Sequence, residues 1–269
     1  MSIHPTAIIE DGARLGERVR IGPYCVVSRD AEIGDGCILG PHVVIHAYAA
    51  LGPECRVHAG AVLGDLPQDL AFRDEPSRVR IGRGCVIREG VTVHRGTKPG
   101  TETVVGDECY LMVNSHLGHN VQLGRRVIVA NGTLLAGYVE VGDGAVLSAN
   151  VLAHQFVRIG RLAMLSGGCG IGKDVPPFCI GRGLSVNDLG GVNVVGLRRA
   201  GIGPAERLQV RNAYRILFRS GLNVSQAVAR IRAEIPPGPA QEMCDFIEQS
   251  HRGICSHGGA EEESEVPGF

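Results

Sequence analysis

The sequence predicts a mostly β protein, in which a parallel β-helix of hexapeptide repeats precedes a small α-helical domain. The main observation is a period of six: over residues 3–171, 25 of the 29 positions spaced six apart carry Ile, Leu or Val. The exceptions are Asp69, Glu75, Pro99 and Ala153. This period matches neither an α-helix nor a hairpin meander, and it is typical of a parallel β-helix. It ends before Pro176 and Pro177, and helical patterns follow.

Each hexapeptide supplies one side of a triangular coil, so three of them make a coil of eighteen residues. Successive coils stack about 4.8 Å apart, as strands do in any sheet. The aliphatic residue points inward, and so does the residue four positions later, where only a small side chain fits. This narrow core explains why the chain has 39 Gly, 4% aromatic residues and no Trp.

The cysteines match this small inward position. Six of the nine occupy it, where a cysteine acts as a compact apolar filler: Cys25, Cys37, Cys55, Cys85, Cys109 and Cys169. No CxxC pair is present, so the sequence supports neither a zinc ribbon nor a redox pair. We expect buried thiols, with no metal and no cofactor.

Two interruptions of the period predict loops, at about residues 68–80 and 97–104. Both are polar, carry proline or charge, and return the chain in phase, so they should project from a corner of the coil. Loops on a rigid scaffold often carry binding residues. The alternative is that these are surface loops without a function.

The period divides the chain into a β-helix over residues 1–177, a connecting stretch over 178–203 and a helical domain over 204–255. Pro204 is a favourable first-turn residue, so the first helix should start there and cover 205–219. A second should follow the cap candidates Asn223 and Ser225 and run to about Ile235. A third should span about 240–252, and the tail over 256–269 should be disordered.

Basic residues gather at the start of the helical region, and they are Arg198, Arg199, Arg207, Arg211, Arg215 and Arg219. The last four recur every fourth residue, so they form one stripe along the first helix. A solvated face would explain this stripe, but Glu206 is the only nearby counter-charge, which favours an acidic partner or a phosphate.

Charge and hydropathy exclude other classes. The net charge of −1 and pI near 6.8 argue against bulk nucleic-acid binding. No stretch is long enough for an integral membrane segment, and no signal-peptide pattern starts the chain. We expect a soluble, cytoplasmic protein.

The eighteen-residue coil predicts a catalytic column. Residues eighteen apart stack, so His119 should lie beside Gly137, and Gly137 beside Gln155. A histidine beside an accessible backbone N–H suits acyl transfer, which needs a base for the attacking hydroxyl and a donor for the oxyanion.

Several motifs resemble the UDP-N-acetylglucosamine acyltransferase family, which opens lipid A biosynthesis in Gram-negative bacteria. The resemblance extends to about residue 253 and includes Gln68-Asp69-Leu70, residues 74–79, 93–97 and 114–119, Leu135-Ala136-Gly137, His154-Gln155-Phe156, residues 174–177 and 211–214. It implies left-handed β-helices in a homotrimer, with active sites between subunits. The implied reaction moves a 3-hydroxyacyl or similar fatty acyl group from acyl carrier protein to the 3-hydroxyl of UDP-N-acetylglucosamine.

The resemblance also implies roles for individual residues. His119 would be the general base, and the Gly137 N–H would stabilise the oxyanion. Substrate-binding residues would be Gln68, Asp69, His116, His154, Gln155, Asn193 and Arg199. Gly167 matches the position that limits acyl length, and glycine there suggests a long groove. The arginine stripe, chiefly Arg207, Arg211 and Arg215, would contact acyl carrier protein, whose phosphopantetheine thioester is a substrate.

Several positions depart from the family pattern. Asn120 replaces the aspartate that orients the base, and Tyr138 replaces the histidine after the oxyanion glycine. A neutral Asn120 stabilises an imidazolium less than a carboxylate would. Other departures are Ala71 for a lysine, Ser185 for a histidine and Val195 for a glutamate. These changes concern the acceptor sugar, the acyl chain and the rate more than the reaction class.

Three alternatives remain at this level. One is a hexapeptide acyltransferase for a different UDP-sugar or an amino sugar, although the usual extra N-terminal domain is absent because hexads start at Ile3. Another is a γ-type carbonic anhydrase, with His94, His116 and His119 as zinc ligands in a spacing that does not match. The third is a non-catalytic paralogue.

Overall fold

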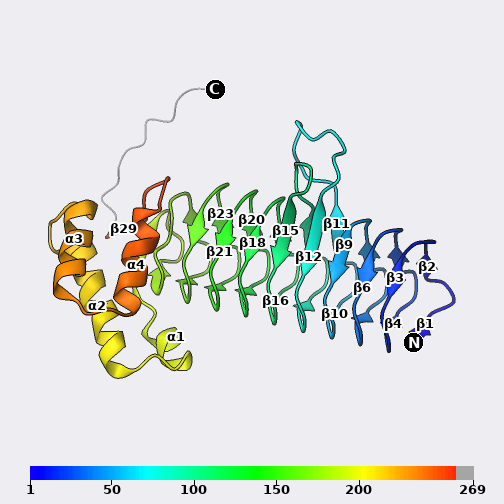
Figure 1. Cartoon of the computed structure of the whole chain (residues 1–269), viewed down its shortest axis with the longest axis horizontal. Helices are drawn as coiled ribbons and strands as arrows, with labels where there is room; N and C mark the ends of the chain where they lie inside the picture. Colours follow the sequence, from blue (N-terminus) through cyan, green and yellow to red (C-terminus); the bar gives the residue numbers. More distant parts are fainter. Residues whose placement is uncertain (259–269) are drawn as a thin grey trace.

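The protein is a long triangular prism with helices at one end (Figure 1). The computed structural model describes residues 1–258. Short strands on the three walls form sheets that we call A, B and C. Sheet A contains β1 (Ser2–Ile3), β4 (Arg20–Ile21), β7 (Ile38–Leu39), β10 (Arg56–Val57), β13 (Val86–Ile87), β16 (Tyr110–Leu111), β19 (Ile128–Val129), β22 (Val146–Leu147), β25 (Met164–Leu165), β27 (Cys179–Gly181), β28 (Asp188–Val192) and β29 (Ser256–His257).

The other two walls are shorter. Sheet B contains β2 (Ile8–Ile9), β5 (Val26–Val27), β8 (Val44–Ile45), β11 (Val62–Asp65), β14 (Thr92–His94), β17 (His116–Leu117), β20 (Leu134–Leu135), β23 (Leu152–Ala153) and β26 (Gly170–Ile171). Sheet C contains β3 (Arg14–Leu15), β6 (Glu32–Ile33), β9 (Ala49–Leu51), β12 (Arg78–Ile81), β15 (Glu102–Val105), β18 (Gln122–Leu123), β21 (Glu140–Val141) and β24 (Arg158–Ile159).

The register confirms the eighteen-residue coil. Ile3 pairs with Ile21 in sheet A, and Leu117 pairs with Leu135 in sheet B. The strand pairs from β1 to β27 are parallel, because each coil runs around the axis in the same direction as the one before. Regular stacking therefore continues from the first coil to the last.

The core is a column of aliphatic side chains with small residues at the corners. Ile45, Leu63, Leu117 and Leu135 are completely buried. All nine cysteines are buried and free, as expected for core fillers. Burial raises the pKa of the Cys169 thiol to about 11, so this thiol remains protonated at neutral pH.

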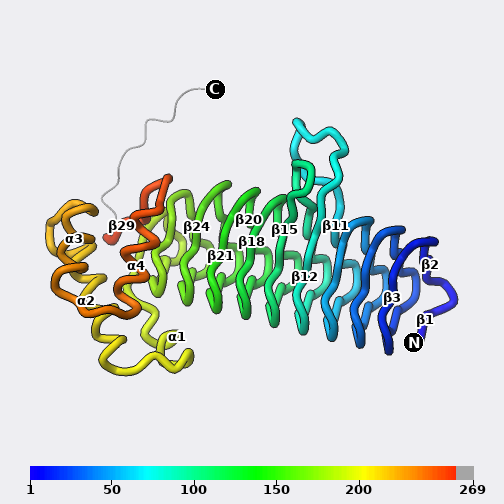
Figure 2. The backbone as a smooth tube through the Cα atoms, viewed as in Figure 1, coloured from blue at the N-terminus to red at the C-terminus, as the bar shows by residue number. Residues whose placement is uncertain are grey.

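Both interruptions leave the prism at the same corner, between sheets B and C (Figures 1 and 2). The longer one joins β11 to β12, and the shorter one joins β14 to β15. The predicted loops extend too far at their ends, because residues 78–80 and 102–104 are strand, paired in β12 and β15. Two separate insertions thus project side by side from one corner.

The C-terminal region has more structure than the sequence suggested. Within the expected connecting stretch, β27 and β28 pair antiparallel, and a helix α1 (Val194–Arg199) follows. Three further helices follow: α2 (Pro204–Arg219), α3 (Val224–Glu234) and α4 (Pro239–Glu248). Helix α4 is therefore shorter than expected, and β29 pairs with β28 at the start of the predicted disordered tail. The rest of that tail, 259–269, lies outside the described residues.

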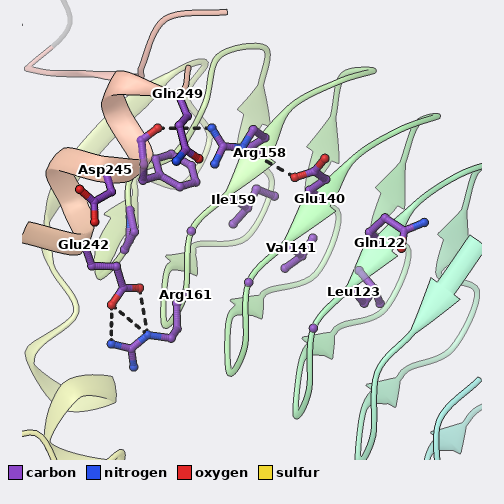
Figure 3. Close-up of a pocket in the computed structure, with 15 residues that line it drawn as sticks. Gln122, Leu123, Glu140, Val141, Arg158, Ile159, Arg161, Glu242, Asp245 and Gln249 are labelled. Carbon is purple, nitrogen blue, oxygen red and sulfur yellow. Dashed lines mark hydrogen bonds and ion pairs between the residues drawn. The ribbon is translucent and has the colours of Figure 1, made fainter. Parts of the chain in front are cut away.

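Arg158 in β24 and Arg161 in the following turn hold helix α4 against the last coils (Figure 3). Arg161 pairs with Glu242 at 2.7 Å, and the Arg158 guanidinium lies 4.3 Å from the centre of the Phe246 ring. Between helix and sheet lies a cavity of about 530 Å³. None of the four helices in residues 1–258 combines the length and the apolar character needed to cross a bilayer.

Candidate active site

His119, Gly137 and Gln155 occupy equivalent positions of three successive coils, as the coil length predicted. They follow β17, β20 and β23 at the corner between sheets B and C, the corner that carries both loops. Backbone bonds keep the coils in step: the Tyr138 N–H donates to the His119 carbonyl at 3.0 Å, and the Phe156 N–H donates to the Gly137 carbonyl at 3.1 Å. The column is therefore fixed by main-chain geometry.

The imidazole of His119 lies directly on the Cα of Gly137. A Cβ at residue 137 would come within 2.5 Å of His119 Nε2, so no larger residue fits without displacing the ring. The glycine thus allows close approach of the backbone to the candidate base. This contact places Nε2 and the Gly137 peptide on the same small area of the surface.

The Gly137 N–H is free to meet a ligand. At an equivalent corner position elsewhere, the Arg125 N–H donates to Asp143 one coil further, at 2.8 Å. Within residues 1–258, the N–H of Gly137 donates to no backbone or side-chain acceptor, and Gln155 stands where the capping aspartate would be. Buried backbone donors are rarely left unpaired, so this one is suited to an oxyanion.

A groove of about 390 Å³ runs past this column, and we call it the His119 groove. Its polar lining includes Gln68, His116, His119, Gly137 and Gln155, all of them expected site residues. Leu134 and Leu152 line it as well, and they point outward from sheet B with exposed fractions of 44% and 53%. The groove therefore combines a polar corner with an apolar wall.

Two more histidines meet beside the base. The rings of His94 and His116 are perpendicular, with centres 5.0 Å apart. Burial, followed by the neighbouring His94 and His119, lowers the pKa of His116 to about 4, and burial lowers the pKa of His94 too. His94 points away from the aliphatic core, yet it is only 8% exposed. Both should be neutral at pH 7.

The residue after the base contacts it directly. Asn120 Oδ1 lies 3.1 Å from His119 Nδ1, and Asn120 is almost fully buried. Asn120 has a φ of +61°, in the left-handed region that asparagine tolerates better than most residues. Asparagine in place of the family's aspartate therefore keeps the contact with His119 but lacks the negative charge.

Two expected substrate residues lie near the groove but do not line it. Asp69, in the long loop, accepts a hydrogen bond from the Ala71 N–H at 2.9 Å, which shapes the loop turn. His154 is exposed, and its Nδ1 lies 3.1 Å from the Gln155 carbonyl oxygen. Their roles toward a substrate remain predictions.

Three other expected residues are elsewhere in the chain. Asn193 caps α1 by accepting from the Gly196 N–H and donates to the Leu162 carbonyl, both at 2.9 Å. Arg199 is exposed on α1. Gly167 lies at the corner between sheets A and B, where a Cβ would contact the Ala149 carbonyl oxygen at 3.4 Å. A single chain therefore does not bring these residues to the groove.

Arg95 anchors the long loop, and the sequence reasoning missed it. Its side chain is 8% exposed, pairs with Asp74 at 2.9 Å and lies against the rings of Tyr48 and Phe72 at 5.8 and 5.3 Å. The loop that carries Gln68 is thereby held to the prism. A basic residue between two loops was the only signal, because the period says nothing about outward positions.

The arginine stripe is only partly available to a partner. Arg211 and Arg215 are exposed on α2, whereas Arg207 is half-buried and donates to the Ile202 carbonyl at 2.6 Å. None of the six arginines forms an ion pair with a carboxylate in the described part of the chain. Across residues 1–258, no group of three or more His, Cys, Asp or Glu side chains is arranged to hold a metal ion. The carbonic anhydrase alternative thus gains no support from the single chain.

Known proteins resemble this chain over almost all of its length. The family model described as UDP-N-acetylglucosamine O-acyltransferase, domain 2, matches residues 174–255, and the bacterial transferase hexapeptide model matches 12–47, 30–65 and 102–137. An acyl-[acyl-carrier-protein]–UDP-N-acetylglucosamine O-acyltransferase from Paraburkholderia phymatum is 43% identical, covering 94% of this chain and 98% of its own. One of the same name from Campylobacter concisus is 36% identical, covering 94% and 97%.

Solved structures agree with the sequence comparison. A UDP-N-acetylglucosamine acyltransferase from Bacteroides fragilis has a TM-score of 0.89 at 40% identity, covering 94% of this chain and 99% of its own. The enzyme from Acinetobacter baumannii also scores 0.89, at 37% identity and 94% and 98% coverage. The left-handed β-helix with a helical C-terminal domain, which the resemblance implied, is confirmed. The chain belongs to the UDP-N-acetylglucosamine O-acyltransferase family.

Proposed function

We propose that the His119 groove transfers a 3-hydroxyacyl or similar fatty acyl group from acyl carrier protein to the 3-hydroxyl of UDP-N-acetylglucosamine, the first step of lipid A biosynthesis. The observation that carries this proposal is the contact between His119 and Gly137, which joins a base to a free backbone donor. The names of the relatives support the substrates.

The reaction needs one base and one oxyanion donor. His119 Nε2 takes the proton of the sugar hydroxyl, whose oxygen attacks the thioester carbonyl carbon. The negative charge moves to the carbonyl oxygen, which accepts a hydrogen bond from the Gly137 N–H. When the tetrahedral intermediate collapses, the carbon–sulfur bond breaks and the imidazolium returns the proton to the phosphopantetheine thiolate. An ester and a free thiol result, and no cofactor takes part.

Substrate contacts follow from the lining of the groove. Gln68, His116 and Gln155 offer polar groups to the sugar, and Asp69 and His154 lie beside them. Leu134 and Leu152 provide an apolar surface for the acyl chain. Gly167 lies further along the prism, where its missing side chain leaves room for a long chain.

A second and third copy of the chain would complete this site. The outward positions of sheet B are mostly apolar: Ile8, in the first strand of the sheet, is 58% exposed, and Leu134 and Leu152, toward its other end, are exposed as well. Sheet C presents charge instead, as with Arg80, which pairs with Glu102. An apolar wall of this kind suits contact between subunits. In a homotrimer, Asn193 and Arg199 of one subunit would reach the nucleotide bound at the next.

The nine free thiols support a reducing compartment, so we place the enzyme in the cytoplasm. The substrates are then the UDP-sugar and acyl carrier protein, whose acidic surface would meet Arg211 and Arg215.

Replacing the base tests the proposal. His119→Ala should lower transfer from acyl carrier protein thioesters to UDP-N-acetylglucosamine by at least about 10²-fold, as loss of a general base does, and leave the melting temperature and the oligomer unchanged. A panel of acyl lengths and UDP-sugars, assayed with the unaltered protein, identifies the preferred pair. Retention of most activity in the variant would remove His119 from the mechanism, and no transfer to any UDP-sugar would overturn the proposed function.

A further inference from the structure

The hydroxyl of Tyr138 belongs to a chain of hydrogen bonds that ends at His119. The Tyr138 hydroxyl lies 2.9 Å from Thr97 Oγ1, and Thr97 Oγ1 lies 3.1 Å from Asn120 Oδ1. Asn120 Oδ1 in turn lies 3.1 Å from His119 Nδ1. Three residues, from the short loop and from two successive coils, therefore connect to the base on the side away from the groove.

Backbone geometry fixes the direction of every bond in this chain. The Thr97 N–H also lies 3.1 Å from the same Asn120 atom, and a backbone N–H can only donate. That atom must therefore be the amide oxygen, whichever way the side chain could otherwise turn. The Asn120 N–H is fixed as well, because it donates to Thr103 Oγ1 at 2.7 Å.

The proton positions follow from this acceptor. Asn120 Oδ1 can only accept, so the Thr97 hydroxyl donates to it and must itself accept from the Tyr138 hydroxyl. For the same reason His119 Nδ1 carries its proton and donates to Asn120. Nε2 is then unprotonated in the neutral ring, and this is the nitrogen beside Gly137.

The ring of Tyr138 adds a steric constraint. It meets the His119 ring edge-on, with centres 5.2 Å apart, and stacks on Phe156 at 4.9 Å. Tyr138 has a φ of +60° at the coil corner, as Asn120 and Phe156 do at theirs. Its ring is thus held on both sides, and its hydroxyl reaches Thr97 from a fixed position.

We infer that Tyr138 and Thr97 are positioning residues for the base: through Asn120, they hold His119 in the tautomer whose Nε2 accepts the proton of the sugar hydroxyl. The inference rests on the proposed function. It assigns a purpose to two residues outside the His119 groove, and it explains how a neutral asparagine can orient a catalytic histidine. With a carboxylate, charge alone would hold the imidazole, whereas an amide needs its own orientation fixed.

Two substitutions remove these hydroxyl groups with little change in side-chain volume. Tyr138→Phe keeps the ring and removes the hydroxyl, and Thr97→Val keeps the shape and removes the hydroxyl to which both neighbours bond. We expect each to lower kcat about threefold to tenfold, the effect of one hydrogen bond, with little change in KM for the sugar. Thr97→Ser should retain activity. Tyr110→Phe is the matched control, because its hydroxyl bonds to Arg88 on sheet A.

The double variant tests whether Tyr138 and Thr97 act through one chain of hydrogen bonds or affect His119 independently. If Tyr138 acts through Thr97, Tyr138→Phe combined with Thr97→Val should be no slower than Thr97→Val alone. Nitrogen-15 NMR of histidine-labelled protein should show the Nδ1-protonated tautomer for His119, identified by its loss in His119→Gln. Thr97→Val should show a larger fraction of the Nε2-protonated tautomer, because only the N–H of residue 97, and no longer its hydroxyl, bonds to Asn120 Oδ1. The inference is overturned if the two losses of kcat multiply in the double variant, or if kcat and the His119 tautomer are unchanged in Thr97→Val.

These results are independent of the acceptor sugar. The tautomer is measured without a substrate. If kcat and the tautomer are unchanged in the Tyr138 and Thr97 variants while the enzyme is active and depends on His119, only the inference is refuted. Absence of transfer by the unaltered protein would refute the proposed function instead.

Discussion

At residue scale, a neutral amide contacts His119, the proposed base. Asn120 Oδ1 accepts from His119 Nδ1 and from two groups of Thr97, all three at 3.1 Å. An oxygen has two lone pairs, so three donors share it and none of the bonds is optimal. A carboxylate at this position would offer more acceptor capacity and would stabilise the imidazolium that forms during attack.

Asn120→Asp should therefore raise kcat. The carboxylate can take over every bond in which Asn120 Oδ1 accepts, and its charge favours proton uptake by the imidazole. The measurement is kcat and KM for the sugar at constant acyl carrier protein thioester. A large loss of activity would show that this pocket is built specifically around the amide.

The pH dependence of stability has a residue-scale origin in His116. Burial lowers the pKa of His116 to about 4 in the folded protein, whereas an unfolded histidine titrates near 6.5. Between these values the unfolded chain binds more protons than the folded one, so acid favours unfolding. His116 should therefore make the free energy of unfolding fall as the pH drops from about 6.5 to about 4.

His116→Gln should make the free energy of unfolding depend less steeply on pH between about 6.5 and about 4. Urea denaturation at pH 7, 6, 5 and 4 gives the free energy of unfolding for the two proteins. His4→Gln is the control, because His4 is exposed at the N-terminal coil and its ring bonds to its neighbour Thr6. An identical pH slope in His116→Gln would assign the acid sensitivity to other groups.

At element scale, helix α2 presents different side chains on its two faces. Its buried side includes Val210, Ala213 and Leu217, which pack on the rest of the domain. Its outer side carries Arg211 and Arg215, which are exposed and have no carboxylate partner in the described residues. The periodicity of the helix thus keeps a basic surface facing solvent while the other face packs on the domain.

Reversing Arg211 and Arg215 to glutamate should raise KM for the acyl carrier protein thioester at least about tenfold at low salt, since rim charges control association with an acidic partner. KM for the sugar should be unchanged. Arg230→Glu, a charge reversal on α3 in the same domain, is the control. An unchanged KM for the carrier would assign the stripe to an ordinary solvated face.

At the scale of the whole molecule, the prism is a one-dimensional stack in which each coil contacts only its neighbours. Cys25 lies near the N-terminal end, and Cys109 lies near the middle, both completely or almost completely buried. Because terminal coils have a neighbour on one side only, they should open first.

The thiols can report this order. In the native protein none of the nine should react with iodoacetamide within minutes at pH 8, and all nine should react in strong denaturant. At intermediate denaturant Cys25 should be labelled before Cys109, as measured by mass spectrometry of peptides. Simultaneous labelling of both would show that the prism unfolds as one cooperative unit.

The sequence by itself predicted the prism and the column of His119, Gly137 and Gln155. Three hexapeptide sides close a coil of eighteen residues, so residues spaced eighteen apart were expected to stack, and the strand register agrees. The six inward cysteines followed from the same count, because the corner admits only small groups.

Only the tertiary structure decided the groups that lie off this period. Thr97 reaches Asn120 and Tyr138 across 23 and 41 residues of chain, and Arg161 reaches Glu242 across 81. No repeat relates these residues, since one partner lies in an insertion or in the helical domain. Their contacts depend on where each loop folds back and how α4 docks, and such packing is set by side chains meeting in three dimensions. The repeat therefore specifies the scaffold and the positions of His119 and Gly137, and the irregular segments specify the contacts made to this pair from outside the repeat.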